Sequence, residues 1–371
     1  MKLLLTCGGT AGHVYPAVAL ARVFQRHYQD CQVLFVGADG GMELKLVAQE
    51  GYPIATVTIS NFRRSLSPKQ WGHNLKSAWN VVHSRRQAAG ILKDFSPDLV
   101  VGTGGYASFP AVRQAARMGI PTAIHESNAS PGLTTRTLAK YVDLVMVGFE
   151  EAVKSYEDPS KVKVTGTPVR PDFFALTRQQ ARAKLGLTDD RPVVLSFWGS
   201  LGASVMNREM LDFMACWREE DMPFHHIHGA GRDYETMRQG LSGRGLDPKD
   251  FDLRQYIYDM PTVMAAADLV LCRAGASTLS ELTATGKPAI LVPSPNVTAN
   301  HQFKNANVLS DRGGALLVEE KDCSGQKLYG MVQDLLADGA GRDRMSQAQL
   351  SLAVPTAAED IYQALMKRMG H

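Results

Sequence analysis

Residues 2–13 run Lys2-Leu3-Leu4-Leu5-Thr6-Cys7-Gly8-Gly9-Thr10-Ala11-Gly12-His13, an apolar stretch that ends in a glycine-rich turn. A short, uniformly apolar run is typical of a strand that is buried on both faces. Glycine lacks a Cβ, so a glycine turn lets a ligand approach the backbone closely. A helical pattern follows, and a helix N-terminus offers free N–H groups and the positive end of its dipole. The stretch therefore predicts a strand, a ligand-binding turn and a helix, the opening of a βαβ unit.

The alternation of apolar runs and helical patterns continues to residue 147 and starts again near residue 193. Strands are predicted at 2–6, 32–36, 54–58, 99–102, 122–125 and 144–147, and then at 193–197, 225–228, 252–256, 269–272, 289–292 and 315–318. Helices are predicted at 16–28, 43–50, 67–93, 107–118 and 134–139, and then at 203–218, 234–240, 260–267, 277–285, 301–310, 324–336 and 357–369. This order predicts an α/β fold with two Rossmann-like parallel-sheet domains that face each other across a cleft.

The domain limits follow from where the pattern restarts. We expect a first domain at 1–166 and a second at 167–355, with a join that contains Pro168, Pro171 and Pro192. A last helix within 356–371 can pack back on the first domain. At about 100–200 residues per domain, a chain of 371 residues accommodates two.

The composition excludes several classes of protein. The chain is 44% apolar with a net charge of only +3, which does not fit a disordered protein. Its five cysteines are odd in number and none has CxxC spacing, so neither a disulfide framework nor a thiolate zinc site is indicated. The N-terminal apolar run is too short for a signal peptide, and no run is long enough to span a membrane. A reduced, cytosolic compartment fits these observations.

Three further glycine-containing turns follow predicted strands. They are 102–106, 199–203 and 275–278, and all four turns lie at strand carboxyl ends. In open α/β sheets ligands bind at that edge. The first turn lacks GxGxxG spacing and the chain has no GxxxxGK[ST] motif, so nicotinamide binding and a P-loop are disfavoured.

Four polar positions could carry chemistry at this edge. His13 follows the first loop at a helix start and is a candidate general base, with helix capping as the alternative. His125-Glu126-Ser127-Asn128 ends another strand, where this run of polar side chains favours a binding role over packing. Arg170 can clamp phosphate or form a hinge ion pair. Glu281 can accept ribose hydroxyls or stabilise a helix dipole.

Metal-binding patterns are weak. Asp250 and Asp252 have DxD spacing but precede a strand rather than follow one, and His225, His226 and His228 alternate along an expected strand. Both sets are therefore interpreted as structural.

Residues 60–95 form the main electrostatic feature of the chain. Seven basic residues face one acid there, and Trp71, Leu75, Trp79 and Val82 recur at helical spacing. Such a stripe suits an anionic membrane surface, or alternatively a core-facing helix with solvated basic residues. Nucleic acid is disfavoured because the rest of the chain is near neutral or acidic.

Several motifs resemble the MurG family of membrane-associated transferases. These are GGTAGHVYPA at 8–17, GTGGYASFPA at 102–111, HESNASPGLTTR at 125–136, GTPVR at 166–170, GSLGA at 199–203, CRAGASTLSE at 272–281 and NHQFKNA at 300–306. They occur in the family's order, and the resemblance implies the GT-B fold.

The resemblance also implies binding roles for individual positions. In the first domain and at the join, the matching substrate-binding residues are Thr10, Ala11 and Gly12 of the first loop, together with Asn128 and Arg170, which match donor-binding positions. In the second they are Ser200, Ile257, Ala276, Ser277, Thr278, Leu279, Ser280, Glu281 and Gln302. Glu281 would contact the ribose, Ile257 the uracil and Gln302 the donor sugar. The family more often has glycine at position 11 and GGSQGA where this chain has GSLGA.

The expected activity is an inverting transfer of N-acetylglucosamine from UDP-N-acetylglucosamine to the C4 hydroxyl of undecaprenyl-linked muramoylpentapeptide. His13 is the first candidate for the base and Glu126 the second. No metal is required by these residues, and use of a divalent cation is left open. The implied location is peripheral, on the cytoplasmic face of the plasma membrane through 60–95. The alternatives are a UDP-N-acetylglucosamine 2-epimerase and a non-catalytic nucleotide-sugar-binding adaptor.

Overall fold

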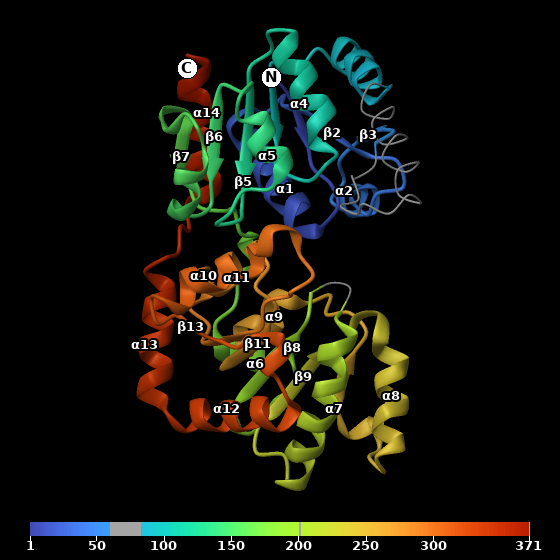
Figure 1. The fold of residues 1–371 in the computed structure, drawn as a ribbon, viewed down its shortest axis with the longest axis vertical. Coiled ribbons are helices and arrows are strands. Elements are labelled where there is room, and N and C mark those ends of the chain that lie inside the picture. Colours follow the sequence, from blue (N-terminus) through green and yellow to red (C-terminus); the bar gives the residue numbers. More distant parts are fainter. Residues whose placement is uncertain (60–82, 200–201, 371) are drawn as a thin grey trace. The chain divides into compact units, whose positions relative to one another are not determined.

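The chain divides into two compact units. The computed structural model describes residues 1–59, 83–199 and 202–370. Unit 1 consists of Met1–Val169 together with Val354–His371, and unit 2 consists of Arg170–Ala353 (Figure 1). The boundary expected from the sequence, after residue 166, lies slightly earlier than the observed one.

Unit 1 is built on a parallel sheet of seven strands. Their order is β3-β2-β1-β4-β5-β6-β7, so the strand order reverses between β1 and β4. The strands are β1 Lys2–Thr6, β2 Gln32–Ala38, β3 Ile54–Val57, β4 Leu99–Gly102, β5 Thr122–Glu126, β6 Leu144–Val147 and β7 Val162–Val164. Every pairing is parallel, which brings all carboxyl ends to one edge.

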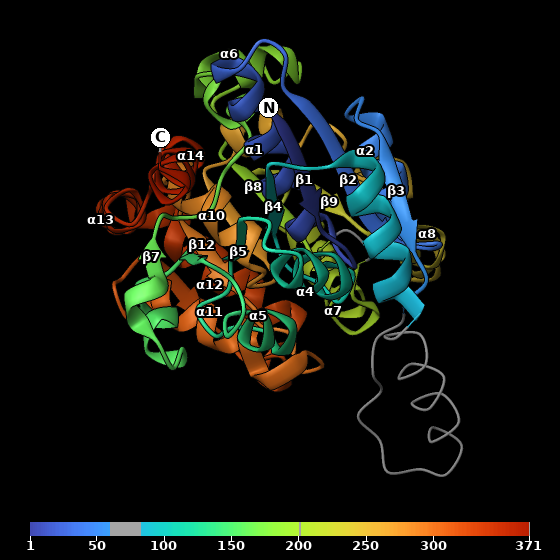
Figure 2. The same cartoon turned by 90° about the horizontal axis from the view of Figure 1, so that it is seen from above.

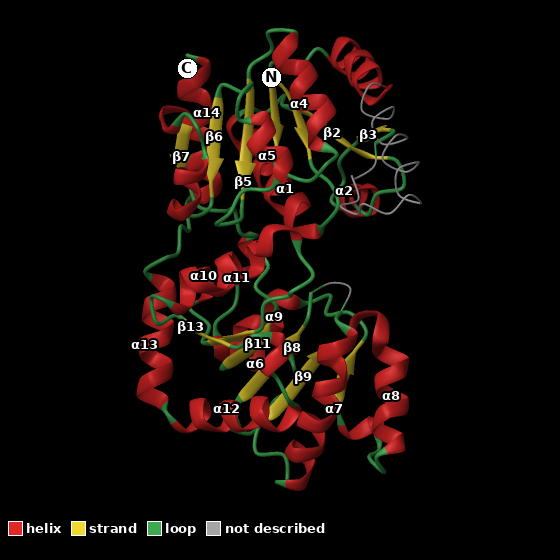
Figure 3. Cartoon of the chain, viewed as in Figure 1, coloured by secondary structure: helices red, strands yellow, loops and turns green. Residues whose placement is uncertain are grey.

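Helices cover this sheet (Figure 3). They are α1 Ala11–His27, α2 Glu43–Gln49, α4 Ser108–Arg117, α5 Leu133–Leu138 and α14 Ala357–Met369, and residues 83–95 are also helical. Short 3-10 helices are η1 Glu150–Ser155 and η2 Pro159–Lys161. Leu3, Leu4 and Leu5 of β1 are completely buried, because helices pack on both faces of the strand.

Unit 2 repeats the topology with six parallel strands. Their order is β10-β9-β8-β11-β12-β13, with the reversal between β8 and β11. The strands are β8 Val193–Phe197, β9 His225–Gly229, β10 Asp252–Arg254, β11 Leu269–Cys272, β12 Ala289–Leu291 and β13 Ala315–Leu317. The helices are α6 Arg178–Lys184, α7 Ser204–Glu219, α8 Tyr234–Gly243, α9 Met260–Ala266, α10 Ala276–Thr285, α11 His301–Ser310, α12 Gly325–Ala337 and α13 Gly339–Leu350, with 3-10 helices η3 Pro171–Phe174, η4 Gly231–Asp233, η5 Pro248–Asp250, η6 Thr298–Asn300 and η7 Glu320–Asp322.

The last helix belongs to unit 1. Ile361 and Leu365 of α14 are buried in the same apolar cluster as β1 and α1. The ring of Tyr362 meets Phe24 edge-on at 5.0 Å and stacks on His27 at 4.0 Å. Figure 2 shows the two helices from above, with α14 in red and α1 in blue. These contacts fix the chain's C-terminal helix against its first helix.

The expected fold class, two Rossmann-like parallel sheets, is confirmed. Four elements differ from expectation. Helix α1 begins at Ala11 rather than at Pro16, which lies inside it; α6 falls within the predicted join; and α13 was not predicted. The edge strand β7, with only three residues, was also not predicted.

Candidate active site

The loop after β1 and the loop after β4 meet where the strand order of unit 1 reverses. Gly9, Gly104 and Gly105 all have positive φ, of 84°, 108° and 79°, which side chains rarely adopt. A Cβ on Gly105 would lie 2.1 Å from the carbonyl oxygen of Gly8. Glycine is therefore required for the two loops to approach each other at this edge.

Thr10, Ala11 and Gly12 lie at the N-terminus of α1. Thr10 is the N-cap residue, and its side chain makes no capping hydrogen bond. It is exposed, and the next two residues are half-buried. The first-turn N–H groups of this 17-residue helix therefore point toward the same edge as the loops.

His13 is held in one orientation by the first loop. Its Nδ1 lies 2.7 Å from the carbonyl oxygen of Gly8. A carbonyl only accepts, so Nδ1 carries the proton and Nε2 presents its lone pair. Among the residues that the structure describes, none hydrogen-bonds to Nε2. The ring packs against Gly104, where a Cβ would lie 2.7 Å from Cδ2. This is the tautomer that a general base requires.

The loop after β5 is organised by Glu126, which is buried. Its carboxylate accepts hydrogen bonds from the backbone N–H and side-chain amide of Asn128, at 3.0 and 2.8 Å, and from the N–H of Gly132 at 3.0 Å. Both oxygens are thus used inside the loop. The geometry favours Glu126 as a residue that positions Asn128, and leaves His13 as the better-placed base.

His125 is buried beneath this loop. Its Nε2 donates to the carbonyl oxygen of Gly166 at 2.9 Å, and burial lowers its pKa. Ser127 lies 3.5 Å from its Nδ1. His125 is therefore a neutral side chain that ties the loop to the segment following β7.

In unit 2 the corresponding edge holds the loop after β8 and the N-terminus of α10. Gly199 and Gly202 have φ of 86° and 75°, and Ser200 between them lies outside the described residues, as does Leu201. A Cβ on Gly202 would meet the carbonyl oxygen of Ala230 at 2.5 Å. Gly275 is the N-cap residue of α10 and has no side chain, so the first-turn N–H groups receive no capping hydrogen bond from it.

The six predicted positions on α10 differ in what they can offer. Leu279 is completely buried and Ala276 is almost completely buried. These two residues can therefore offer a ligand only their backbone groups. The hydroxyl of Ser280 donates to the Ala276 carbonyl at 3.0 Å. Ser277 and Thr278 are half-buried at the helix start.

Glu281 and Arg170 interact electrostatically. Burial raises the pKa of Glu281 from 4.5 to about 7, and the positive charge of Arg170 partly opposes this rise. No hydrogen bond to the Glu281 carboxylate is found within the described residues. The guanidinium of Arg170 lies 5.3 Å from the centre of the Phe173 ring. A half-buried carboxylate with unused acceptor capacity is suited to sugar hydroxyls.

Ile257 and Gln302 lie on segments next to the same loops. Ile257 is buried against Gly229, the last residue of β9. Gln302, on α11, accepts a hydrogen bond from the N–H of Ser294 at 2.8 Å. Next to Ile257, Tyr258 is 86% exposed and packs on Tyr256 with ring centres 4.8 Å apart.

The comparisons with known proteins cover the whole chain. The glycosyltransferase family 28 N-terminal domain matches residues 3–147 and the C-terminal domain of that family matches 193–361. The UDP-N-acetylglucosamine–N-acetylmuramyl-(pentapeptide) pyrophosphoryl-undecaprenol N-acetylglucosamine transferase of Desulforamulus reducens is 38% identical over 99% of this chain and 98% of its own. The crystal structure of Acinetobacter baumannii MurG superposes with a TM-score of 0.74 at 26% identity, covering 99% of both chains. The chain belongs to the MurG family.

MurG-family membership establishes the GT-B fold for this chain. A UDP-GlcNAc 2-epimerase from Neisseria meningitidis also superposes, with a TM-score of 0.67 over 99% of this chain and 100% of that one. Its identity is only 15%, so this likeness concerns the fold alone.

Two residues that the sequence analysis overlooked organise these edges of the MurG-family fold. Arg273 is buried and donates to the carbonyls of Val292 and Pro293, at 3.0 and 3.2 Å, while it pairs with Glu320. It thereby joins the segments after β11, β12 and β13. Glu43 accepts from the N–H groups of Gly9 and Ala38. A conspicuous signal for Glu43 was the group Gly37, Gly40 and Gly41 just before it.

The weak metal patterns have structural partners. Asp250 pairs with Arg218 and Asp252 with Arg254. His226 and His228 both bond to the hydroxyl of Ser196, at 2.8 and 2.7 Å. Burial lowers the pKa of His226 to about 3, so it is a neutral core side chain.

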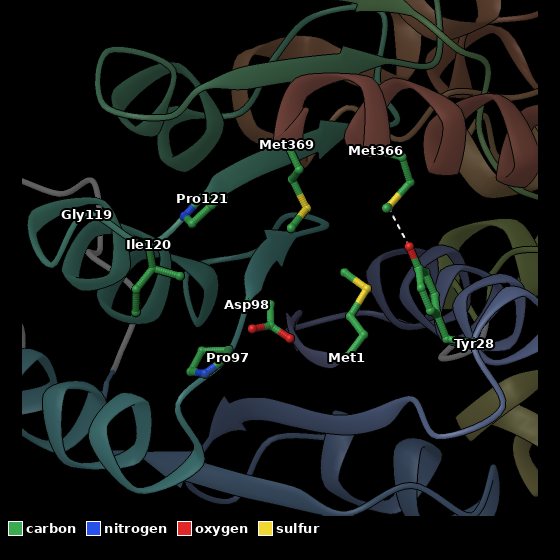
Figure 4. Close-up of a pocket in the computed structure, with 9 residues that line it drawn as sticks. All are labelled: Met1, Tyr28, Pro97, Asp98, Gly119, Ile120, Pro121, Met366 and Met369. Atoms are coloured by element: carbon green, nitrogen blue, oxygen red, sulfur yellow. Dashed lines mark hydrogen bonds between the residues drawn. The ribbon is translucent and has the colours of Figure 1, made fainter. Parts of the chain in front are cut away.

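A cavity of about 600 Å³ lies at the opposite edge of the sheet in unit 1 (Figure 4). Its walls include Met1, Tyr28, Ile120, Pro121, Met366 and Met369. Met1 and Pro121 directly precede β1 and β5, so the cavity is at the amino ends of the strands. It is therefore separate from the glycine loops.

Proposed function

We propose that this chain transfers N-acetylglucosamine from UDP-N-acetylglucosamine to the C4 hydroxyl of undecaprenyl-diphospho-N-acetylmuramoylpentapeptide. The Desulforamulus reducens relative, named as an N-acetylglucosamine transferase acting on N-acetylmuramyl-(pentapeptide) pyrophosphoryl-undecaprenol, supports this proposal at 38% identity over 99% of this chain. The observation that favours transfer over binding alone is the tautomer of His13. Its Nδ1 proton is committed to Gly8, which leaves Nε2 to remove the acceptor's hydroxyl proton.

Unit 2 binds the donor in this proposal. The N–H groups at the start of α10 face the diphosphate, where the helix dipole favours negative charge. Glu281 accepts the ribose hydroxyls, and Arg170 adds positive charge next to it. These groups also stabilise the charge that develops on UDP as it leaves. Ser200, Ile257 and Gln302 keep the donor roles that the family resemblance implies.

Unit 1 supplies the base and binds the acceptor. Thr10, Ala11 and Gly12 offer first-turn N–H groups, and Asn128, which keeps the donor-binding role that the family resemblance implies, is held in place by Glu126. The C4 oxygen attacks the anomeric carbon, the bond from that carbon to the UDP oxygen breaks, and the C4 proton passes to His13. A single displacement of this kind inverts the anomeric configuration.

A peripheral location on the cytoplasmic membrane face completes the proposal. The acceptor's polyprenyl chain stays in the bilayer, and none of the helices in the described part of the chain is long and apolar enough to cross a membrane. The stripe of Trp71, Leu75 and Trp79 lies outside the described residues. Within 83–95, Arg86 and Lys93 are exposed, whereas Arg85 is half-buried over the ring of Phe109 at 5.5 Å.

The direct test incubates the purified chain with UDP-N-acetylglucosamine and a lipid-linked muramoyl acceptor. We expect acceptor-dependent formation of the lipid-linked disaccharide. Free N-acetylmannosamine without acceptor would instead identify an epimerase. Donor binding with neither product would leave the adaptor alternative, in which His13→Ala has no functional consequence.

A further inference from the structure

Glu43 is a buried carboxylate beneath the first glycine loop, and the proposed reaction so far gives it no role. It begins α2, is fully inaccessible to solvent, and bridges two loops. One oxygen, Oε1, accepts the N–H of Ala38 at 2.9 Å, and the other, Oε2, accepts the N–H of Gly9 at 3.2 Å. A buried carboxylate is costly unless it is hydrogen-bonded, so its presence here calls for a reason.

The surrounding glycines make room for this carboxylate. A Cβ on Gly41 would lie 2.4 Å from Oε1, and one on Gly8 would lie 2.9 Å from the same oxygen. A Cβ on Gly37 would lie 2.7 Å from Cγ of Glu43. Three backbone positions, in the loop after β1, in β2 and before α2, therefore leave room for the Glu43 carboxylate because they are glycines; a Cβ on Gly8 would also meet Ala107.

Glu43 and His13 bind opposite ends of the same peptide group. The carbonyl of Gly8 and the N–H of Gly9 belong to one amide. The carbonyl oxygen accepts the Nδ1 proton of His13 at 2.7 Å, and the N–H donates to Glu43. A negative charge at the N–H end polarises the amide and strengthens its carbonyl as an acceptor.

We propose that Glu43 is a positioning residue that acts on His13 through the Gly8–Gly9 peptide. The carboxylate fixes the plane of this peptide, so that its carbonyl holds the imidazole in the tautomer with a free Nε2. The polarised carbonyl also stabilises the imidazolium that forms when His13 takes the acceptor's proton. The arrangement corresponds to a carboxylate–histidine pair with an amide inserted between the carboxylate and the imidazole. The role given to Glu43 rests on the proposed function.

The other titratable groups around His13 do not supply this charge. Burial raises the pKa of Cys7 and of Tyr106, and burial lowers the pKa of His125, so all three are neutral near pH 7. Glu126 is two strands away from β1 in the sheet, and its oxygens are used by Asn128 and Gly132. Glu43 is the carboxylate that contacts the Gly8–Gly9 peptide, to which His13 also bonds.

The test compares the pH dependence of kcat/KM for the full chain and for Glu43→Gln, which keeps the side chain's size and removes its charge. We expect kcat to fall about ten- to a hundredfold, as when the carboxylate behind a functional histidine is removed. Loss of the charge lowers the basicity of His13, so the acid limb moves to lower pH. The affinity for UDP-N-acetylglucosamine stays unchanged because the Glu43 carboxylate bonds to Gly9 and Ala38, which are not among the proposed donor residues. Glu43→Asp keeps the charge and restores the wild-type limb in part.

Glu50→Gln is the matched control, since Glu50 caps the other end of α2 and pairs with Arg22 on the surface. It should leave the profile unchanged. An unshifted acid limb in Glu43→Gln, with wild-type protein active, would overturn the proposal, whereas inactive wild-type protein would instead count against the proposed function. If Glu43→Gln folds poorly, 15N NMR of the ten histidines, with His13→Ala for assignment, tests the tautomer in the wild type. A proton on Nε2 of His13 would equally overturn it.

Discussion

The carboxylate of Glu126 holds Asn128 by both its backbone and its side-chain amide, at 3.0 and 2.8 Å. The contact explains why the polar run at 125–128 contains both Glu126 and Asn128: the carboxylate positions the amide. Glu126 fixes where the amide of Asn128 lies, and in the proposed function this amide contacts the ligand.

Glu126→Gln should therefore weaken the reaction by displacing Asn128, and should leave the acid limb of the pH–rate profile in place. Hydrogen bonds to charged groups contribute about 1.5–3 kcal/mol each, so we expect a loss of roughly ten- to a hundredfold in kcat/KM. The double variant Glu126→Gln/Asn128→Ala should lose little more than Asn128→Ala alone. Additive losses, or a missing acid limb in Glu126→Gln, would restore Glu126 as a candidate for the base.

His13→Ala should lower kcat by about 10²–10⁴, the usual contribution of a positioned general base. Donor affinity should stay near the wild-type value, because His13 is not among the residues proposed to bind the donor. Steady-state kinetics with isothermal titration of UDP-N-acetylglucosamine separate the two effects. A decrease of less than tenfold in kcat would reduce His13 to a positioning residue.

Donor binding should weaken as the pH falls from about 8 to 6. Burial raises the pKa of Glu281 to about 7, so its carboxylate becomes protonated over this range and accepts ribose hydroxyls less well. The diphosphate of UDP-N-acetylglucosamine is esterified at both ends and does not titrate there. Glu281→Gln should bind the donor more weakly at pH 8 and lose this pH dependence. A pH dependence that persists in Glu281→Gln would assign it to another group.

The same pKa shift has a consequence for stability, with a definite sign. The pKa of Glu281 rises on folding, from 4.5 to about 7, so the group favours the folded state most below pH 4.5. This contribution is lost as the pH rises through about 7. Thermal unfolding at pH 8 should therefore show Glu281→Gln to be at least as stable as wild type. A clearly lower Tm would support the alternative in which Glu281 stabilises the dipole of α10.

Membrane binding should depend on the exposed charges of 83–95. Each basic residue near an anionic surface contributes about 1 kcal/mol, so Arg86→Glu/Lys93→Glu should weaken cosedimentation with anionic vesicles at least thirtyfold. The half-buried Arg85 is a poor choice because its substitution also removes the contact with Phe109. Lys249→Glu/Lys321→Glu, which reverses two exposed charges in unit 2, is the matched control. Equal binding by both double variants would place the membrane contact elsewhere.

Much of the fold could be predicted because its strands are short, apolar and buried on both faces. Leu3–Leu5 and Leu269–Leu271 carry that signal without ambiguity. Strand β7 carries little of it, since Lys163 interrupts three residues at an exposed sheet edge. Helix α13 buries mainly Met345 and Gln349, so it has no apolar face that a pattern could detect.

The candidate site was predictable to the extent that its residues follow strands. Glu126 ends β5, and His13 and Glu281 lie in the first turns of the helices that follow β1 and β11. Parallel strands bring such positions to the carboxyl edge of their sheet. The sequence could not show that His13 is better placed as the base and that Glu126 positions Asn128, because this depends on which atoms form hydrogen bonds. Glu43 was overlooked for the same reason, since its role comes from a peptide 34 residues earlier in the chain.

The anomeric configuration of the product tests the central claim most directly. Wild-type protein is incubated with UDP-N-acetylglucosamine and the lipid-linked muramoyl acceptor, and the purified product is analysed by NMR. A single displacement assisted by His13 predicts one N-acetylglucosamine per acceptor, joined to the C4 oxygen in the β configuration, since the donor is α. An α-linked product, or consumption of the donor without a disaccharide, would contradict the account.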